Sequence, residues 1–411
     1  MIDSLMIPSG GVTKMNNTKN GKVDSVIKLI LFLVSPFIAF LYSLRNMNAK
    51  SSFVIFFLFC LCFGMVFTTP QDDYPLDGKY YRFIFEKMVF ISTFDYALLL
   101  NEFAEFDEGS KDFYDTTISF VISRFTDNYH VLFFVYAAIF SFFMLKSFKF
   151  LTNERNFDNS FTSFVLATLF ILSNSIFNIN GVRFWTAAWI GVYCIFQLFR
   201  NNNRRYFLLA LCTPIVHVSF YFFVAILIIA YFTKKYEKFW LILFVVSFFT
   251  SNFTSSILAS ISQFLPSFIS NTIQTYITFK MEISLHKYVF GIIEWLFVNI
   301  LVFIFYYNKK IIQQQPIAYN LYLFLVVFIV FVNFTLPIQS IGTRFIELSI
   351  PFIVYIWLLV FKDRKYTFVL YLFPIVNLYK YFILGTLYIL VTEYDLFVMN
   401  PFFLIYTYLF A

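Results

Sequence analysis

Charged residues are scarce in this sequence. They make up 13% of its 411 residues, while apolar residues make up 60% and the mean hydropathy is +0.76. Soluble domains carry about 25% charged residues, so a soluble globule of this composition would expose large aromatic patches to water. The composition excludes a soluble enzyme, a disordered chain and a nucleic-acid binder. The net charge of +7 does not indicate nucleic acid, because Lys and Arg report orientation in membrane proteins.

Cysteines and catalytic signatures are also few. The four cysteines, Cys60, Cys62, Cys194 and Cys212, lie inside apolar runs, which excludes a disulfide framework and a zinc site. The sequence has no Walker motif, no GxGxxG, no HExxH and no GxSxG. We predict no bound metal and no cofactor, although Asp72 and Asp73 could hold a metal ion.

Long apolar runs are what the sequence does contain. A membrane-spanning helix needs about 20 apolar residues, whereas barrel strands alternate over about 10. The continuous runs predict an all-α, polytopic membrane protein, with a disordered N-terminal tail over 1–25 and a single membrane domain over 26–411. About ten crossings are expected: Val26–Leu44, Phe53–Thr69, Val131–Phe150, Phe161–Ile179, Phe184–Phe199, Phe239–Phe253, Tyr288–Tyr307, Ile317–Leu336, Phe345–Phe361 and Tyr366–Val391.

Short basic loops recur between alternate crossings and predict the orientation. By the positive-inside rule they are cytoplasmic. The lysines of the N-terminal tail then lie outside, against the rule. The basic loops contain Arg45/Lys50, Lys146/Lys149/Arg155, Arg200/Arg204/Arg205, Lys234/Lys235/Lys238, Lys309/Lys310 and Lys362/Arg364/Lys365.

The run Tyr206–Phe232 has a basic cluster at both ends. Two full crossings need about 40 residues, which this run does not have. We predict a re-entrant helical hairpin that is broken near Pro214 and turns around His217–Ser219, because non-helical backbone at that depth is tolerated where it lines a protein cavity. One tilted crossing is the alternative.

Two polar segments are expected to be extracytoplasmic loops, 70–128 and 254–287. The first holds twelve acidic and five basic residues. Tyr80, Tyr81, Ile84, Phe85, Met88 and Val89 recur at helical spacing in it, as do Phe113, Thr117, Phe120, Val121 and Phe125. These patterns predict amphipathic helices that lie along the membrane surface.

Ionisable residues at membrane depth are candidates for function. Arg183 begins a crossing at the outer interface, where interfacial anchoring is the alternative. Arg344 and Glu347 stand at i and i+3, so they can also simply pair with each other. Glu294 lies about two turns into its crossing, and a pair with Lys287 or His286 would explain it too.

His217 and the acids after the second crossing carry the same ambiguity. His217 lies at the predicted tip of the broken helix, and a plain interhelical hydrogen bond is the alternative. Asp72, Asp73 and Asp77 directly follow a crossing, where a solvated acidic turn is the alternative.

Three ordered patterns resemble the bacterial exopolysaccharide and O-antigen polymerase group (Wzy type, EpsG-like branch). They are the Asp-and-Tyr run Asp72–Tyr81, the Arg-containing stretch Asn180–Ala188, and His217-Val218-Ser219. The resemblance extends over roughly residues 26–365. Phe184 stands where the family often has Gln, and the outer loop is longer and more acidic than the family leads us to expect.

The resemblance implies a glycosyltransferase of the bacterial cytoplasmic membrane. Such an enzyme moves a growing glycan from one undecaprenyl diphosphate onto a new lipid-linked oligosaccharide repeat unit. The implied partners are that lipid-linked oligosaccharide, the lipid bilayer, and the chain-length regulator and flippase of the pathway.

The candidate residues divide into two roles. A sugar hydroxyl must lose its proton to a base, for which Asp73 is the first candidate, Asp77 the second and Glu347 the third, with His217 also placed in the catalytic set.

Arginine binds phosphate in a bidentate manner, so Arg183 and Arg344 are expected to converge on the diphosphate. Tyr80, Tyr81 and Glu294 complete the predicted substrate-binding set.

Two other functions stay open at this point. A single-sugar transferase that uses a polyprenyl-phosphate sugar would add one residue instead of a polymer ladder. A transporter or flippase would place charges near the midplane instead of at the outer helix ends.

Overall fold

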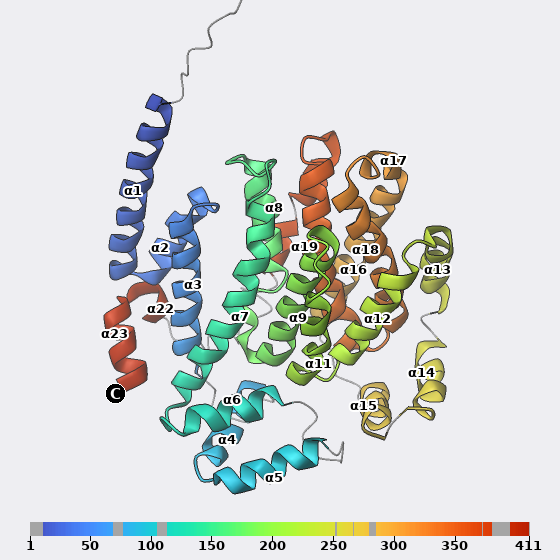
Figure 1. Cartoon of the computed structure of the whole chain (residues 1–411), viewed down its shortest axis with the longest axis horizontal. Helices are drawn as coiled ribbons and strands as arrows, with labels where there is room; N and C mark the ends of the chain where they lie inside the picture. The colour runs from blue at the N-terminus through green and yellow to red at the C-terminus, as the bar shows by residue number, and fades with distance from the viewer. Residues whose placement is uncertain are drawn as a thin grey trace, which may run out of the picture.

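The described part of the chain is helical and contains no strand element (Figure 1). Most of these helices stand side by side in one bundle, and several short helices gather beyond one end of it (Figure 1). This confirms the predicted all-α class. The computed structural model describes residues 11–68, 77–104, 113–250, 253–265, 267–278, 285–371, 373–379 and 395–410.

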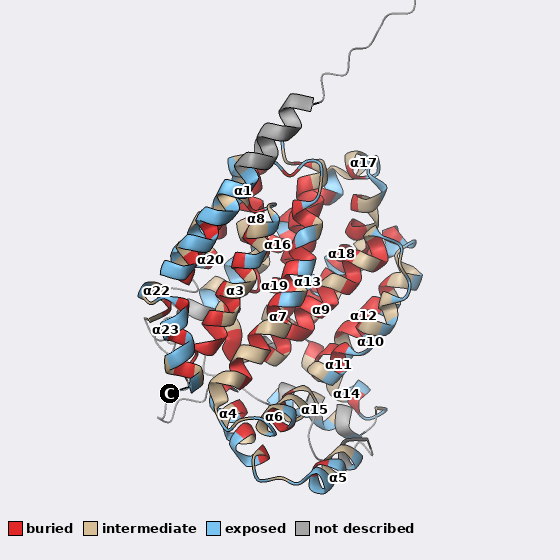
Figure 2. Cartoon of the chain, turned by 60° about the vertical axis from the view of Figure 1, so that its left-hand side comes forward, coloured by how far each residue is buried: buried red, intermediate tan, exposed pale blue. Residues whose placement is uncertain are grey.

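The centre of the bundle is built from long apolar helices whose side chains are buried on most faces (Figure 2). Trp189 and Trp357 are fully buried there. On the perimeter, Phe249 and Phe303 are 74% and 60% exposed, and many other large apolar side chains are exposed with them. An apolar perimeter around an apolar core suits lipid as the solvent. The central helices are α7 (Tyr129–Thr152), α9 (Val182–Ile195), α18 (Pro316–Thr335) and α19 (Gln339–Val360), while α16 (Leu285–Tyr307), which carries Phe303, lies at the perimeter.

Within the described residues, five helical stretches are long and apolar enough to cross a membrane, and a bent pair of helices raises the number to six. They support a membrane protein, and the larger count of about ten crossings stays a prediction. The end of the predicted crossing Tyr366–Val391 lies outside the described residues. The stretches are Tyr129–Thr152, Phe161–Arg200, Tyr288–Tyr307, Pro316–Thr335 and Ile341–Val360, with Glu237–Phe249 and Thr254–Ser262 as the bent pair.

The expected first crossing, Val26–Leu44, is not one helix. Helix α1 (Gly11–Val34) ends before Pro36, whose ring cannot continue a helix. Ser35 caps α2 (Pro36–Ser43) by accepting a hydrogen bond from the Ile38 amide at 3.3 Å. The chain turns back at this break, so Lys28 Nζ on α1 lies 3.2 Å from Ser51 Oγ, at the start of the next helix.

This reversal also bears on the N-terminal tail. Helix α1 begins at Gly11, inside the segment 1–25 that the composition predicts to be disordered, and residues 1–10 lie outside the described part. The described start of α1 therefore lies at the end of the bundle that carries Lys50 (Figure 1). The conflict between its lysines and the positive-inside rule disappears.

A close seam joins α3 (Lys50–Met65) to α7. A methyl group added to Gly64 would lie 2.4 Å from Ala137 Cβ and 2.6 Å from the carbonyl oxygen of Phe133. Only glycine permits this approach of the two backbones.

The stretch Phe161–Arg200 is a helical hairpin. Helix α8 (Phe161–Leu172) is followed by the short 3-10 helix η2 (Ile176–Gly181) and then by α9. The indole N–H of Trp189 donates a hydrogen bond to the backbone carbonyl of Asn174 at 2.9 Å. The side-chain amide of Asn174 donates to the backbone carbonyl of Trp185 at 3.1 Å. The chain after α8 therefore lies back against α9.

A second reversal follows at His217–Ser219. It separates α10 (Tyr206–Leu211) and α11 (Thr213–Val216) from α12 (Phe220–Thr233). The ammonium of Lys234 lies 4.6 Å from the centre of the Phe199 ring, so both basic ends of the run meet at one end of the bundle. Helix α12 has 14 residues, about 21 Å at 1.5 Å per residue, which is shorter than the membrane core. This arrangement supports the predicted hairpin, whose depth in a membrane stays a prediction.

The loops predicted to be cytoplasmic are joined to one another by ion pairs. Arg200 Nη2 lies 2.6 Å from Glu154, and Lys362 Nζ lies 2.7 Å from Asp158. In the same way Lys309 on α17 (Lys309–Ile312) lies 2.6 Å from Glu237 on α13 (Glu237–Thr250). These loops therefore share one end of the bundle.

The two predicted outer segments lie at the opposite end (Figure 1). Met88, Tyr96 and Phe120 form a small core of their own between three of these helices, in which the Tyr96 and Phe120 rings stack at 3.9 Å. The helices are α4 (Asp77–Met88), α5 (Thr93–Ala104) and α6 (Tyr114–Ser123) from the first segment, and α14 (Thr254–Ser262) and α15 (Ser267–Thr278) from the second.

The apolar face expected for α6 is only partly correct. Phe120 is buried, but Val121 is 48% exposed and Phe125 is 82% exposed. Asp115 and Ser119 face the bundle instead, and they lie four residues apart on one side of α6. On α4 the expected face holds better, because Tyr81, Phe85 and Met88 are buried.

Candidate functional site

The candidate site lies where the start of α9 meets the outer helices. The side-chain oxygen of Asn180, at the end of η2, accepts a hydrogen bond from the Gly78 amide at 2.8 Å. A methyl group on Gly78 would lie 2.9 Å from the Phe67 ring and 3.0 Å from that Asn180 oxygen. The absence of a side chain at Gly78 thus lets α4 dock beside Arg183.

Arg183 projects from the first turn of α9 into the outer helices. Its Nε donates a hydrogen bond to the Tyr81 hydroxyl at 3.1 Å, and its Nη1 lies 3.6 Å from Asp115 Oδ1. The guanidinium carbon lies 5.0 Å from the centre of the Tyr81 ring and 5.9 Å from that of Tyr80. One arginine therefore contacts α4 and α6 together.

Asp115 is the site residue that sequence reasoning missed. It is one of twelve acidic residues in the loop, yet it is only 2% exposed. The phenols of Tyr81, Tyr114 and Tyr136 surround it: the Tyr114 and Tyr136 rings stack at 5.5 Å, and the Tyr81 and Tyr136 rings meet edge to face at 6.1 Å. The signal in the sequence was one acid and one serine at i and i+4 among apolar neighbours.

The tyrosines of α4 and α6 keep their protons in this setting. Burial raises the pKa of Tyr81, and this effect outweighs the opposing effect of Arg183. Burial also raises the pKa of Tyr114. These hydroxyls are therefore neutral near neutral pH and remain hydrogen-bonding groups.

His217 lies beside the two predicted arginines. Its ring is 5.3 Å from the Phe184 ring, and the guanidinium carbon of Arg344 is 5.2 Å from the same Phe184 ring. Phe184, the neighbour of Arg183 in the chain, lies against both His217 and Arg344. The structure thus brings together two arginines and a histidine from α9, α19 and the turn before α12.

The turn that carries His217 is fixed from two sides. His217 Nδ1 is hydrogen-bonded to Ser219 Oγ at 2.8 Å, and the histidine is only 9% exposed. The Phe113 amide, directly before α6, donates to the Ile215 carbonyl at 3.0 Å. The same outer helix therefore holds both Arg183 and the His217 turn.

Glu347 and Glu294 are buried on neighbouring parallel helices. Glu347 lies one turn after Arg344 on α19 and is 7% exposed, while Glu294 on α16 is 8% exposed. A methyl group on Gly291 of α16 would lie 3.8 Å from Thr343 Cγ2 of α19, so the two helices are close at this point. Glu294 and Glu347 each lie about one turn further along their own helix. Pairing of Arg344 with Glu347 stays a prediction, and the side chains of His286 and Lys287 lie outside the described residues.

Of the three acids that follow the predicted second crossing, only Asp77 lies within the described residues. Asp73, with Asp72, lies outside the described residues. Asp77 begins α4 and is exposed, and Tyr80 is 51% exposed next to Arg183. Over the described ranges, no cluster of three or more His, Cys, Asp or Glu side chains could hold a metal ion.

Fold and site together define a helical membrane protein with a cationic, aromatic site at one end of its bundle. The chain belongs to the EpsG family, whose model matches residues 116–400. Arg183, His217 and Arg344 lie within the matched residues, and the Asp72–Tyr81 pattern lies before them. Membership supports a polysaccharide polymerase-type membrane protein, a glycosyltransferase-type activity and a lipid-linked substrate. No curated protein and no solved structure matches the chain.

Proposed function

We propose that this protein polymerises lipid-linked oligosaccharide repeat units into a surface polysaccharide at the outer face of the bacterial cytoplasmic membrane. The growing glycan is transferred from undecaprenyl diphosphate to a sugar hydroxyl of a new lipid-linked unit. The observation that carries the proposal is that His217 and Arg344 both lie against Phe184, next to Arg183, at the end of the bundle opposite the basic loops.

The two arginines suit a diphosphate leaving group. Each guanidinium offers several donors in a planar fork, and hydrogen bonds between charged partners are about twice as strong as neutral ones. Charge builds on the diphosphate oxygens as the glycosidic bond breaks. The arginines therefore stabilise the transition state more than the bound substrate, which is the requirement for catalysis.

Asp115 and Tyr81 position the first of these arginines. Neither residue adds a positive charge to the site. Tyr81 and Asp115 instead hold the guanidinium of Arg183 from two sides. A substrate phosphate meets an arginine that has already lost its rotamer freedom, which lowers the entropic cost of binding. Tyr80, half exposed beside Arg183, is the aromatic face on which a sugar ring can stack.

The base is proposed to be Asp73, with Asp77 second and Glu347 third. Asp73 follows the second crossing, where a lipid-linked acceptor would present its sugar. His217, which is hydrogen-bonded to Ser219 and lies against Phe184, is proposed to contribute a hydrogen bond to the substrate. Glu294 is proposed to bind the substrate from α16.

Deletion of the gene, followed by electrophoresis of the surface glycan, tests this function. The expected result is loss of the polymer ladder and accumulation of single repeat units on the lipid carrier. A single-sugar transferase would instead leave a ladder whose repeat unit is one residue shorter. An unchanged ladder would exclude both transferases.

The proposed partners are tested in the same strains. The flippase would deliver the lipid-linked substrate before polymerisation, and the chain-length regulator would act while the chain grows. Crosslinking of the tagged protein in the membrane should capture the regulator, and loss of the flippase should deplete the substrate without lowering the amount of this protein.

A further inference from the structure

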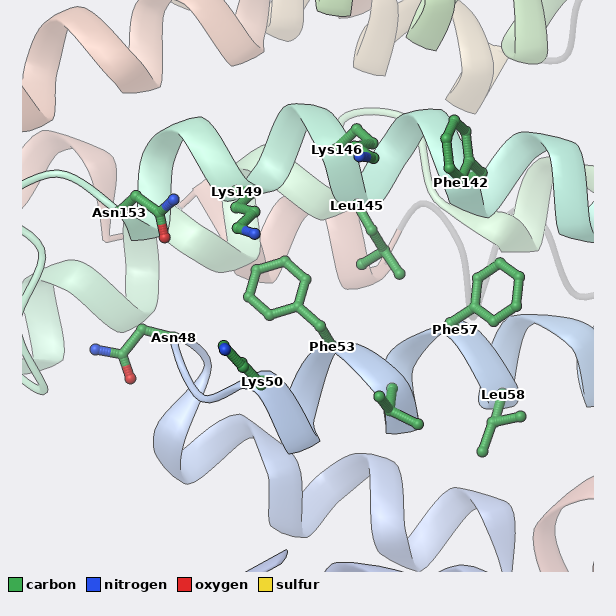
Figure 3. A pocket seen from close by; sticks show the side chains of 11 residues that line it. Asn48, Lys50, Phe53, Phe57, Leu58, Phe142, Leu145, Lys146, Lys149 and Asn153 are labelled. Atoms are coloured by element: carbon green, nitrogen blue, oxygen red, sulfur yellow. The ribbon is translucent and has the colours of Figure 1, made fainter. Parts of the chain in front are cut away.

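A groove between α3 and α7 lies at the end of the bundle with the basic loops, far from the candidate site. It encloses about 500 Å³, a volume within the usual range of ligand sites. Figure 3 shows its two halves, with Lys50 and Lys149 on facing helices at one end and Phe57, Leu58 and Phe142 toward the other. The groove is therefore polar at its mouth and apolar along its length.

The apolar part is built from matched stripes on the two helices. Phe53, Val54, Phe57 and Leu58 recur at helical spacing along α3, and Phe142 and Leu145 face them from α7. Phe142 is 50% exposed and Val54 is 56% exposed, so this wall is open to the surroundings. An elongated apolar chain can lie against it.

The mouth carries positive charge without a carboxylate. Lys50 and Lys149 line it, Asn48 and Asn153 add amide donors, Lys146 lies further along beside Phe142, and no lining residue is acidic. These lysines differ from Lys309 and Lys362 at the same end, which are held by Glu237 and Asp158. Among the ion pairs of the described residues, none involves Lys50, Lys146 or Lys149.

We propose that this groove binds an anionic phospholipid, with its phosphate at Lys50 and Lys149 and one acyl chain along Phe53, Phe57 and Leu58. Charge complementarity selects the head group, and the apolar wall selects a lipid over a free anion. Basic pockets between transmembrane helices on the cytoplasmic side are suited to such head groups. The lipid would lie in this groove on the side of the α3–α7 pair, at the end of the bundle opposite Arg183.

The test is lipid retention by the full-length protein, measured by native mass spectrometry in mixed micelles with phosphatidylglycerol or phosphatidylcholine. The wild-type protein should retain phosphatidylglycerol preferentially. Each lysine near an anionic head group contributes about fivefold in affinity, so the double variant Lys50→Gln/Lys149→Gln should bind roughly 25-fold more weakly. Leu58→Trp, which fills the apolar wall and keeps every lysine, should also weaken retention.

The matched control is Lys235→Gln/Lys238→Gln, which removes two exposed lysines at the same end outside the groove. It should retain phosphatidylglycerol like the wild type. Equal loss in this control would show general surface attraction and overturn the proposal. So would equal retention of phosphatidylcholine, full displacement by millimolar inorganic phosphate, or preferential retention of a polyprenyl phosphate. The readout is binding, so its result is independent of the proposed polymerase activity.

Discussion

Arg183 Nη1 lies 3.6 Å from the Oδ1 of Asp115, a carboxylate that is almost completely buried in the outer helices. Removal of one member of a buried charge pair leaves the other without compensation, which is more costly than loss of an exposed pair. Arg183 was selected from the sequence for its contact with substrate. Its pairing with Asp115 shows that the same residue also holds α6 against the start of α9.

We expect Asp115→Asn to lower polymer synthesis by roughly 10²-fold, because a misplacement of about 1 Å at a positioned group costs that much. Asn keeps the shape and removes the charge that orients Arg183. Glycan synthesis in purified membranes, at equal protein levels, measures the change. Asp127→Asn, an exposed acid of the same segment, should remain active. If both variants remain active, Asp115 has no positioning role.

The arginine substitutions test the diphosphate contact directly. Lys supplies charge without the planar fork of Arg, so Arg183→Lys and Arg344→Lys should each lose most polymerase activity while the protein inserts at normal levels. An interfacial anchor would tolerate Lys, which extends to the interface equally well. Arg204→Lys, an exposed arginine at the other end, is the control. Normal polymer in both site variants would refute the diphosphate contact.

The convergence of Arg183, His217 and Arg344 could be approached from sequence because each arginine begins an apolar run at the outer face, and His217 lies at the predicted tip of a broken helix. Charge at a helix end and alternating basic loops fix the membrane level at which these residues lie. Asp115 could not be selected in this way. Its burial depends on how α6 packs on α7 and α9, and the apolar residues of α6 pointed to a different face.

The predicted crossings also divide into features that the sequence determines and features that it does not reveal. Long apolar runs such as α18 and α19 were predictable because length and composition alone determine them. The break at Ser35-Pro36 was not recognised, although a capping serine followed by proline is a local signal for a helix start. The sequence therefore predicted one crossing over Val26–Leu44 where the chain reverses.

Gly78 offers a test of how α4 docks. Gly78→Ala should destabilise the protein by about 1–3 kcal/mol, since the added methyl group would overlap the Phe67 ring and the Asn180 side chain. Gly21→Ala is the control, because no atom lies within 4 Å of the added methyl group, and alanine favours its helix by about 1 kcal/mol. Thermal unfolding in detergent compares the two. Equal melting temperatures would mean that α4 does not depend on this close approach.

Asp73 is tested by Asp73→Asn, which keeps the side-chain shape and removes its basicity. Loss of a general base should lower activity by roughly 10²–10⁴-fold. Asp77→Asn should have a smaller effect, as its exposed side chain at the start of α4 contacts solvent. The rate of polymer formation in membranes is the measurement. Wild-type glycan length in the Asp73 variant would remove Asp73 from the mechanism and leave Asp77 and then Glu347 as candidates, which Asp77→Asn and Glu347→Gln would examine.

The last prediction concerns orientation. Lys234 reaches the Phe199 ring, so the loops on both sides of the His217 hairpin should face the cytoplasm while α4–α6 face outside. Tyr236 is 56% exposed and Phe125 is 82% exposed, which makes both suitable for cysteine labelling. In a background where the exposed Cys212 is replaced by Ser, a membrane-impermeant maleimide should label Phe125→Cys in intact cells and Tyr236→Cys only after permeabilisation. Labelling of Tyr236→Cys in intact cells would mean that the run Tyr206–Phe232 crosses the membrane once and that the hairpin is wrong.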